Sequence, residues 1–380
     1  MLKFLPFYFL LFFFQSISHA QVSMGVNRQY VLGRERMTDF PIEDLTDIKS
    51  TTLVFFYRKA DESILPELEK ALTSVWKVTP LKLVPYSQAD KYLNEPNYSY
   101  ASISTLINGE FRNSARAGMW ELYLDFWINK PGKKRTKESF AWVYISTGSA
   151  IPAAHIKAPV RTASYGPYVF KAGFYNHTDY YRGDYMCDLA YRIKGNEELI
   201  TQKELPMTDK YFNYLYTYST FHNWTIPDLK TYFSIVNEHL LTGASRTFCQ
   251  KERDDDQLKK LKETTLMIPE YAFLTPDLDN KRKDTLIYKR TSDAEIEKVL
   301  SAYPYTTKIV STEELTKLIQ DPSRTTYYIS HVVNEYKTLT IINSRTRNII
   351  YSNCRYVSKN EALREKDMIL LKETIAGERK

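Results

Sequence analysis

Glycine is scarce in this chain, with 12 residues in 380. Parallel α/β units that bind nucleotides use glycine-rich turns after a strand, where backbone N–H groups approach the phosphates. No GxGxxG or P-loop pattern occurs, and the two turns where such a loop is expected, residues 58–62 and 275–292, contain no glycine. The sequence therefore argues against nucleotide binding by the usual route.

Cysteine and histidine are also scarce, with three and six residues. They form no CxxC or HExxH pattern, and the GxSxG pattern of hydrolases does not occur. One group, His177, Asp179 and Asp184, has the side chains of a metal site. Loops of this composition use the same residues as turn formers and helix caps. We therefore predict no catalytic residue, no metal and no cofactor.

Only one long hydrophobic run is present, at residues 4–14, and Pro6 interrupts it. Lys3 precedes the run and a small-residue motif at 18–20 follows it, which is the pattern of a secretory signal peptide cleaved before Gln21. The run is too short to cross about 30 Å of hydrocarbon, which disfavours an uncleaved membrane anchor. We predict an exported protein of the periplasm or outer envelope, or a secreted one, with no transmembrane span after cleavage.

Neither sign of charge dominates the composition. Lys and Arg total 52 and Asp and Glu 45, which gives a net charge of +7. This mild excess suits an anionic surface as a partner, but it is not diagnostic of nucleic acid, and we predict no nucleic-acid partner. The length suggests two or three domains.

What the chain does contain is a diverged copy of itself. The motif ELEKAL returns as EIEKVL, and KYLNEP returns as KLIQDP. The matching segments keep the same order in both stretches, which chance matches of two or three residues would not give. This order indicates an internal duplication. The paired segments are 51–55 with 264–268, 67–72 with 295–300, 91–96 with 317–322, and 103–104 with 329–330.

The apolar pattern assigns both copies to the α/β class, with α+β character. Short apolar strands alternate with helical periodicity, and two alternating strands form a closing hairpin, so each copy is predicted to be a β-α-β-α-β-β-β module. The stretch between the copies is aromatic-rich and mainly helical. We divide the chain into a signal peptide at 1–20, a leader segment at 21–49, module A at 50–147, a Tyr-rich and helical middle segment at 148–262, module B at 263–353 and a C-terminal helix at 354–380.

The three cysteines are Cys187, Cys249 and Cys354. An exported chain keeps a disulfide, because the compartments outside the cytosol are oxidising. Cys187 and Cys249 both lie between the two copies, so we predict that they pair and leave Cys354 over. The alternative is three free, buried thiols.

Two features are candidates for a partner surface. The first is the positive charge at the two hairpin turns, which would meet an anionic lipid or glycan, although lysines there also protect a sheet edge from pairing. The second is the density of tyrosine in the middle segment, which suits glycans and protein interfaces but equally serves to pack that segment on the modules. The basic residues are Lys130, Lys133, Lys134, Arg135, Lys137, Arg345 and Arg347, and the tyrosines are Tyr165, Tyr168, Tyr175, Tyr180 and Tyr181.

The second copy resembles a type of envelope module. Its segments STEELTKL (311–318), YYIS (327–330), TLTIIN (338–343) and NIIYS (348–352) look like the α/β modules of the curli-secretion lipoprotein and the amino-terminal domain of the Tol-Pal beta-propeller protein. The whole chain also resembles exported proteins of Bacteroidota-type bacteria. This resemblance implies a role in the cell envelope. Pore formation and the translocation role do not carry over, because the lipidated cysteine and the propeller repeats are missing.

We interpret the chain as a non-enzymatic, exported interaction or assembly protein of the cell envelope, and the sequence leaves its oligomeric state open. The partner would be an envelope protein, or an anionic lipid or glycan. The alternative is a glycan-binding or glycan-hydrolysing protein that uses the aromatic middle segment. Glycosidases need two carboxylates across a cleft, and the candidate pairs are Asp179 with Asp184 and Glu121 with Asp125.

Overall fold

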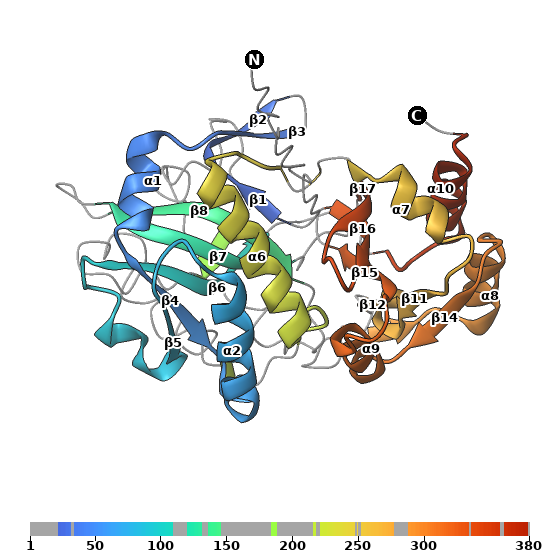
Figure 1. The fold of residues 1–380 in the computed structure, drawn as a ribbon, viewed down its shortest axis with the longest axis horizontal. Coiled ribbons are helices and arrows are strands. Elements are labelled where there is room, and N and C mark those ends of the chain that lie inside the picture. Colours follow the sequence, from blue (N-terminus) through green and yellow to red (C-terminus); the bar gives the residue numbers. More distant parts are fainter. Residues whose placement is uncertain are drawn as a thin grey trace, which may run out of the picture.

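The structure is a computed structural model, and it shows two mixed β-sheets with their helices side by side (Figure 1). One sheet comes from the first part of the chain and the other from the last part. The residues that the structure describes are 22–31, 34–108, 120–130, 136–145, 184–187, 216–217, 221–247, 249, 252–276, 288–333, 336–357 and 361–378.

The first sheet has a parallel centre and an antiparallel side. β4 lies between β5 and β6 and runs parallel to both. β7 and β8 continue the sheet as a hairpin and β1 closes that edge, so the order is β1-β8-β7-β6-β4-β5, with β9 paired to the far half of β6. Its elements are β1 (Val22–Met24), α1 (Ile42–Lys49), β4 (Thr52–Tyr57), α2 (Leu65–Val75), β5 (Leu81–Pro85), β6 (Tyr98–Asn108), β7 (Trp120–Lys130), β8 (Thr136–Ile145), β9 (Asp184–Cys187) and α6 (Ile226–Thr242). A ribbon of β2 (Val26–Val31) and β3 (Arg34–Thr38) follows β1.

The second sheet has the same construction. β11 lies parallel to β14 and β15, and β16, β17 and β10 follow antiparallel, so the order is β10-β17-β16-β15-β11-β14. Its elements are β10 (Glu252–Arg253), α7 (Asp255–Lys260), β11 (Leu266–Pro269), α8 (Asp293–Ser301), β14 (Thr307–Val310), α9 (Thr312–Gln320), β15 (Tyr327–Val333), β16 (Tyr336–Asn343), β17 (Ile349–Tyr356) and α10 (Glu365–Ala376). A ribbon of β12 (Leu274–Pro276) and β13 (Tyr288–Arg290) lies between β11 and α8.

The predicted fold class is confirmed: both halves follow the predicted order of strands and helices, and apart from β9 the strands have the same order in the two sheets. In the first half, the element between β5 and β6, Tyr86–Lys91, is a 3-10 helix and not an α-helix. The shared unit is larger than the predicted modules, because an edge strand and a short helix precede the first parallel strand in both halves. β1 and α1 come from the predicted leader segment, and β10 and α7 come from the predicted middle segment. We call the two units unit A (22–242) and unit B (252–376).

A closing helix completes each unit. α6 packs on α2 in unit A, and α10 packs on α8 in unit B. Both helices begin with an aspartate at the third position whose carboxylate accepts from the backbone N–H of the N-cap residue, at 3.0 Å in α6 and 2.9 Å in α10. Both end at a glycine with left-handed φ, Gly243 at 74° and Gly377 at 78°. The duplication therefore includes this helix, and unit A differs by a long insertion before it.

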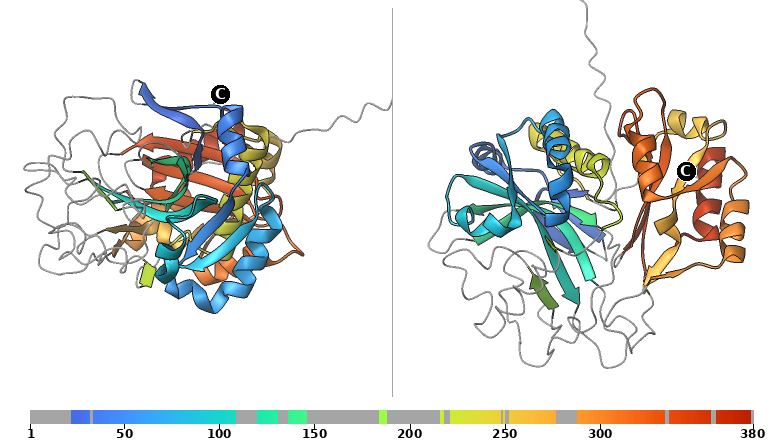
Figure 2. Two further views of the ribbon diagram at one scale, coloured as in Figure 1. Left: turned by 90° about the vertical axis from the view of Figure 1, so that its left-hand side faces the viewer. Right: turned by 90° about the horizontal axis from the view of Figure 1, so that it is seen from below.

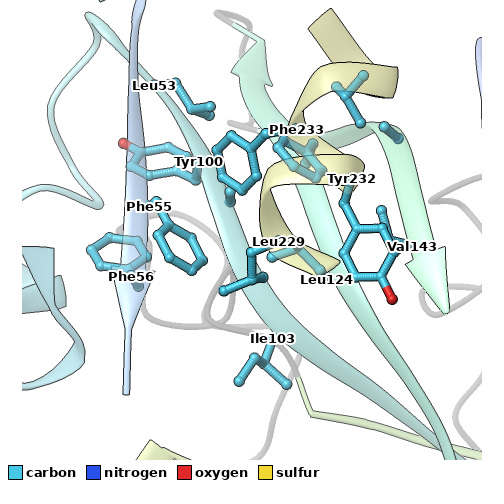
Figure 3. Close-up of a cluster of buried hydrophobic side chains, with 14 of the residues drawn as sticks. Leu53, Phe55, Phe56, Tyr100, Ile103, Leu124, Val143, Leu229, Tyr232 and Phe233 are labelled. Carbon is cyan, nitrogen blue, oxygen red and sulfur yellow. The ribbon is translucent and has the colours of Figure 1, made fainter. Parts of the chain in front are cut away.

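The core of unit A lies between its sheet and α6 (Figure 3). Leu229, Tyr232 and Phe233 of α6 point into the apolar face of the strands. Phe233 makes edge-to-face contacts with Phe55 at 5.4 Å and with Phe126 at 5.2 Å between ring centroids. Such geometry is the preferred one for aromatic pairs, and it adds to the burial of apolar area.

The predicted disulfide is wrong: Cys249 pairs with Cys354, at a Cα–Cα distance of 5.2 Å. The reason is the pairing of β10 with β17, in which Glu252 lies opposite Ser352. Because these strands are antiparallel, the residues just before β10 run beside those that follow Ser352. The backbone of Cys187 instead lies in β9, opposite Thr105 of β6. The alternative of three free thiols is wrong for the same reason.

The two units meet along a seam with a buried centre. Tyr123, Trp142 and Tyr144 of unit A pack with Val332 of unit B, and Met37, Cys249 and Cys354 lie against this cluster. α6 also packs on α9. Helices α7, α8 and α10 lie on the face of the second sheet away from unit A (Figure 2). Unit B therefore presents its other face, which carries α9, to unit A.

Candidate functional site

The carboxyl end of β4 is the place where an α/β unit most often binds a ligand. There, Arg58 forms a buried, two-pronged ion pair with Asp61: Nη2 to Oδ1 is 2.6 Å and Nε to Oδ2 is 3.1 Å. The backbone N–H of Arg58 also donates to Asp61 Oδ2 at 3.1 Å. The side chain that would attract an anion at this edge is therefore already neutralised.

Residues from the segment before α6 cover this ion pair. Trp224 Nε1 donates to Asp61 Oδ2 at 3.2 Å. The rings of Phe221 and Trp224 lie over the Arg58 guanidinium at 4.7 and 5.1 Å. Tyr216 stacks on a tyrosine at the end of β5, with centroids 4.1 Å apart, and its hydroxyl accepts from the N–H of Ile103 at 2.7 Å. The chain's own side chains fill the edge.

Unit B closes the corresponding edge in a similar way. After β11 comes a 3-10 helix, Glu270–Phe273, whose last three residues are buried. The N–H of Leu363, in the segment before α10, donates to the carbonyl of Ala272 at 2.7 Å. In both units the segment that leads into the closing helix therefore covers the carboxyl end of the central strand.

A second cluster lies on the face of the first sheet opposite α6. The fully buried Asp125 carboxylate pairs with Lys137, and the hydroxyls of Ser104 and Ser139 donate to it at 3.3 and 3.2 Å. The Lys137 ammonium lies 5.4 Å from the Trp127 ring. Lys137 is thus a buried partner of Asp125 and not a surface cation of the hairpin turn, so the prediction for this residue is wrong.

Near α6, burial shifts the pKa values of ionisable groups from both units. Burial raises the pKa of Asp228 to about 6, although its carboxylate accepts from Thr225. Burial lowers the pKa of His222 to about 4, and its ring stacks on Tyr271 with centroids 4.8 Å apart. Burial also raises the pKa of Tyr328 well above its usual value, and the nearby Arg347 opposes this shift.

Two of the predicted basic residues, Arg345 and Arg347, lie in the turn between β16 and β17. Arg345 is exposed. Arg347 is half-buried and has a φ of 62°, the only positive φ of a non-glycine residue in the described part of the chain. Its Nη1 atom is buried and has no hydrogen-bond acceptor among the described residues. Lys230 of α6 is close enough for the Arg347 charge to lower its pKa, although burial is the larger cause.

The other predicted site residues divide into two groups. Lys130 ends β7 and Asp184 begins β9, and only their backbones are described, as is the case for Glu121 in β7. The remainder lie outside the described residues: Lys133, Lys134, Arg135, Tyr165, Tyr168, Tyr175, Tyr180, Tyr181, His177 and Asp179. Sequence reasoning missed Lys230 and Tyr328, because no spacing along the chain brings residues of separate units together.

Comparison of the chain with protein-family models, with curated proteins and with solved structures gives no match. Within the described residues, no helix has the length and apolar character needed to span a membrane. The same residues contain no group of three or more His, Cys, Asp or Glu side chains able to hold a metal ion. The chemistry of the chain's own side chains is therefore the basis for a functional proposal.

Proposed function

We propose that this chain is an exported, non-enzymatic interaction or assembly protein of the cell envelope. The observation that carries the proposal is the closed edge of unit A, where Trp224 and Phe221 cover the Arg58–Asp61 ion pair. Enzymes of the α/β class use this edge for substrate or cofactor. A unit that fills it with its own aromatic side chains is better suited to present its outer surface to a partner.

The connection between the units supports the same proposal. The Cys249–Cys354 disulfide fixes the linker to β17, and the buried cluster around Trp142 joins the two sheets. An exported compartment is the place where such a disulfide persists. Two copies of one unit held in this way form a scaffold with a defined relative orientation, which suits assembly with a larger partner.

The glycan-hydrolase alternative gains no support from Asp125. Its carboxylate is fully buried, pairs with Lys137 and accepts from two serine hydroxyls. A retaining or inverting glycosidase needs two carboxyl groups about 5–9.5 Å apart on either side of the sugar. A carboxylate that is neutralised inside the sheet does not reach a substrate.

Affinity capture from the native envelope tests the proposal. The mature chain, beginning at Gln21, would be cross-linked in intact cells, purified and analysed by mass spectrometry. We expect a defined envelope partner, and we expect charge reversal at the exposed Arg345 to reduce its recovery. The matched control is Lys262→Glu, because Lys262 is exposed and makes no ion pair in the described part of the chain. Recovery of the protein in the cytosolic fraction, or of no partner above background, would count against the proposal.

A further inference from the structure

An apolar patch lies on the surface of unit A where α1 meets the end of α6 (Figure 1). Ile42 and Leu241 are 83% and 55% exposed, and no other large hydrophobic side chain of the described residues is exposed. The N–H of Phe40 donates to the carbonyl of Gly243 at 3.0 Å, and the half-buried Leu45 lies against Gly243. Ile42 is one helical turn from Leu45, and Leu241 is in the last turn before Gly243, so both flank the same contact. We call Ile42, Leu45 and Leu241 the α1–α6 patch.

Unit B has the scaffold of this patch but not its apolar surface. The paired segments 51–55 and 264–268 continue back into α1 and α7 at the same spacing. This alignment places Ile42 opposite Asp255, which is exposed. Aligned on the aspartate at their third position, α6 has 17 residues and α10 has 12, and Leu241 lies in the additional last turn. The shared fold therefore requires neither exposed side chain, and their occurrence at one place in unit A indicates an interaction surface rather than scattered exposure.

The charge around the patch is negative. Asp39 is held there because its Oδ1 atom accepts from the N–H of Ser245 at 2.6 Å. Burial lowers the pKa of His239, so this residue adds no positive charge at pH 7, and Lys49 lies at the opposite end of α1 from Ile42. Three exposed acids near the patch form no ion pair in the described part of the chain: Asp39, Glu43 and Asp47.

We propose that the α1–α6 patch binds a cationic amphipathic segment of a polypeptide partner. Such a segment places apolar side chains on the patch while its lysines or arginines face the surrounding acids. The same acids repel an anionic bilayer, which disfavours a lipid surface as the occupant. This inference deepens the proposed function, because it names one surface and the chemistry of its partner. It rests on that function only where the partner belongs to the envelope.

A labelled peptide tests the patch directly. The probe is an amphipathic helical peptide of about 15 residues built from Leu and Lys, and fluorescence anisotropy follows its binding to the full mature chain at low salt. We expect the dissociation constant to rise at least about tenfold in the Ile42→Ser, Leu241→Ser double variant, because both apolar contacts are lost. Both side chains are exposed, so far-UV circular dichroism should show a wild-type fold.

Charge reversal has a matched control within the chain. Glu43 is the second residue of α1, and Asp256 is the second residue of α7 at the corresponding place in unit B. Both are exposed, and reversal to lysine removes the same favourable interaction with a helix N-terminus in each. We expect Glu43→Lys to weaken peptide binding about threefold at low salt, with no effect of Asp256→Lys. The difference should vanish as salt is raised, because screening removes it.

Three results of the peptide assay would overturn the proposal. They are the lack of binding by wild type, equal binding of a peptide in which Glu replaces Lys, and equal weakening by Asp256→Lys. Two further measurements identify other occupants. Self-association in sedimentation velocity that the double variant abolishes would place a second copy on the patch, and the same loss of binding to phosphatidylcholine vesicles would place a lipid surface there; either would contradict a cationic polypeptide.

Failure of the patch and failure of the proposed function are distinguishable. Peptide binding that depends on Ile42 and Leu241, together with no partner in the envelope capture, preserves the patch and contradicts the proposed function. An envelope partner whose recovery is unchanged in the Ile42→Ser, Leu241→Ser variant, together with no peptide binding, preserves the proposed function and contradicts the patch.

Discussion

Removal of the Cys249–Cys354 disulfide should destabilise unit B much more than unit A. The bond joins residues 105 positions apart, and the loop that it closes contains most of unit B. Chain-entropy arguments give about 4.7 kcal/mol for a loop of roughly 100 residues, and measured values are typically about 2–4 kcal/mol. We therefore expect the Cys249→Ser, Cys354→Ser double variant to lose about 2–4 kcal/mol of the free energy of unfolding of unit B.

The chain contains its own reporter for this experiment. All five tryptophans precede residue 225, so their fluorescence follows unit A, together with its contact to unit B at Trp142, whereas far-UV circular dichroism follows both units. In guanidinium chloride, we expect the dichroism midpoint of the double variant to fall below its fluorescence midpoint. Cys187→Ser is the control and should leave both midpoints unchanged. A loss of less than about 1 kcal/mol, or equal shifts of both signals, would refute the reasoning that the bond constrains the unfolded chain of unit B.

Three further predictions concern buried charges and the backbone. The pKa of Asp228 is raised to about 6, so the contribution of this group to stability is present at low pH and is lost as pH rises from about 4 to 6. The pKa of His222 is lowered to about 4, so the contribution of this group is present above about pH 6.5 and is lost as pH falls toward 4. As pH falls from 6.5 to 4, urea titrations should therefore show that the free energy of unfolding of Asp228→Asn decreases by up to about 3 kcal/mol more than that of wild type. Equal slopes for the two proteins would contradict this. Asp125→Asn removes the carboxylate that pairs with the buried Lys137 ammonium and should cost about 3–5 kcal/mol by tryptophan-detected unfolding, whereas a loss below about 1 kcal/mol would show that the pair is not desolvated. Arg347→Gly removes the left-handed strain and should stabilise the protein by about 1 kcal/mol in urea; destabilisation would contradict the strain argument.

The sequence predicted the repeated unit but not its ends. Strand and helix motifs survive duplication in the same order, because each keeps its own apolar periodicity. The closing helices α6 and α10 share an aspartate at the third position and a terminal glycine, and little else. The long insertion before α6 also separates this helix from the rest of its copy in the sequence. A two-residue edge strand such as β10 gives no periodicity at all, which is why the Cys249–Cys354 pairing was not predicted.

The candidate site was predicted only in part, for a different reason. The turn that contains Arg345 and Arg347 is visible in the sequence, but the half-burial of Arg347 is not. Lys137 belongs to a similar group of cations in the sequence, but it is buried because it pairs with Asp125 on the neighbouring strand. Composition alone does not separate a solvated cation from a buried one. That distinction depends on which strand lies next to it, and the fold decides this.

Co-sedimentation of the mature chain with native envelope membranes tests the central claim most directly. The claim is that this protein is an interaction or assembly protein of the cell envelope, which binds its partner through its outer surface. We expect the bound fraction to fall as salt is raised, and to fall at low salt in an Arg345→Glu variant but not in Lys262→Glu. Binding that is lost equally in all variants, or no binding at any salt concentration, would contradict the claim.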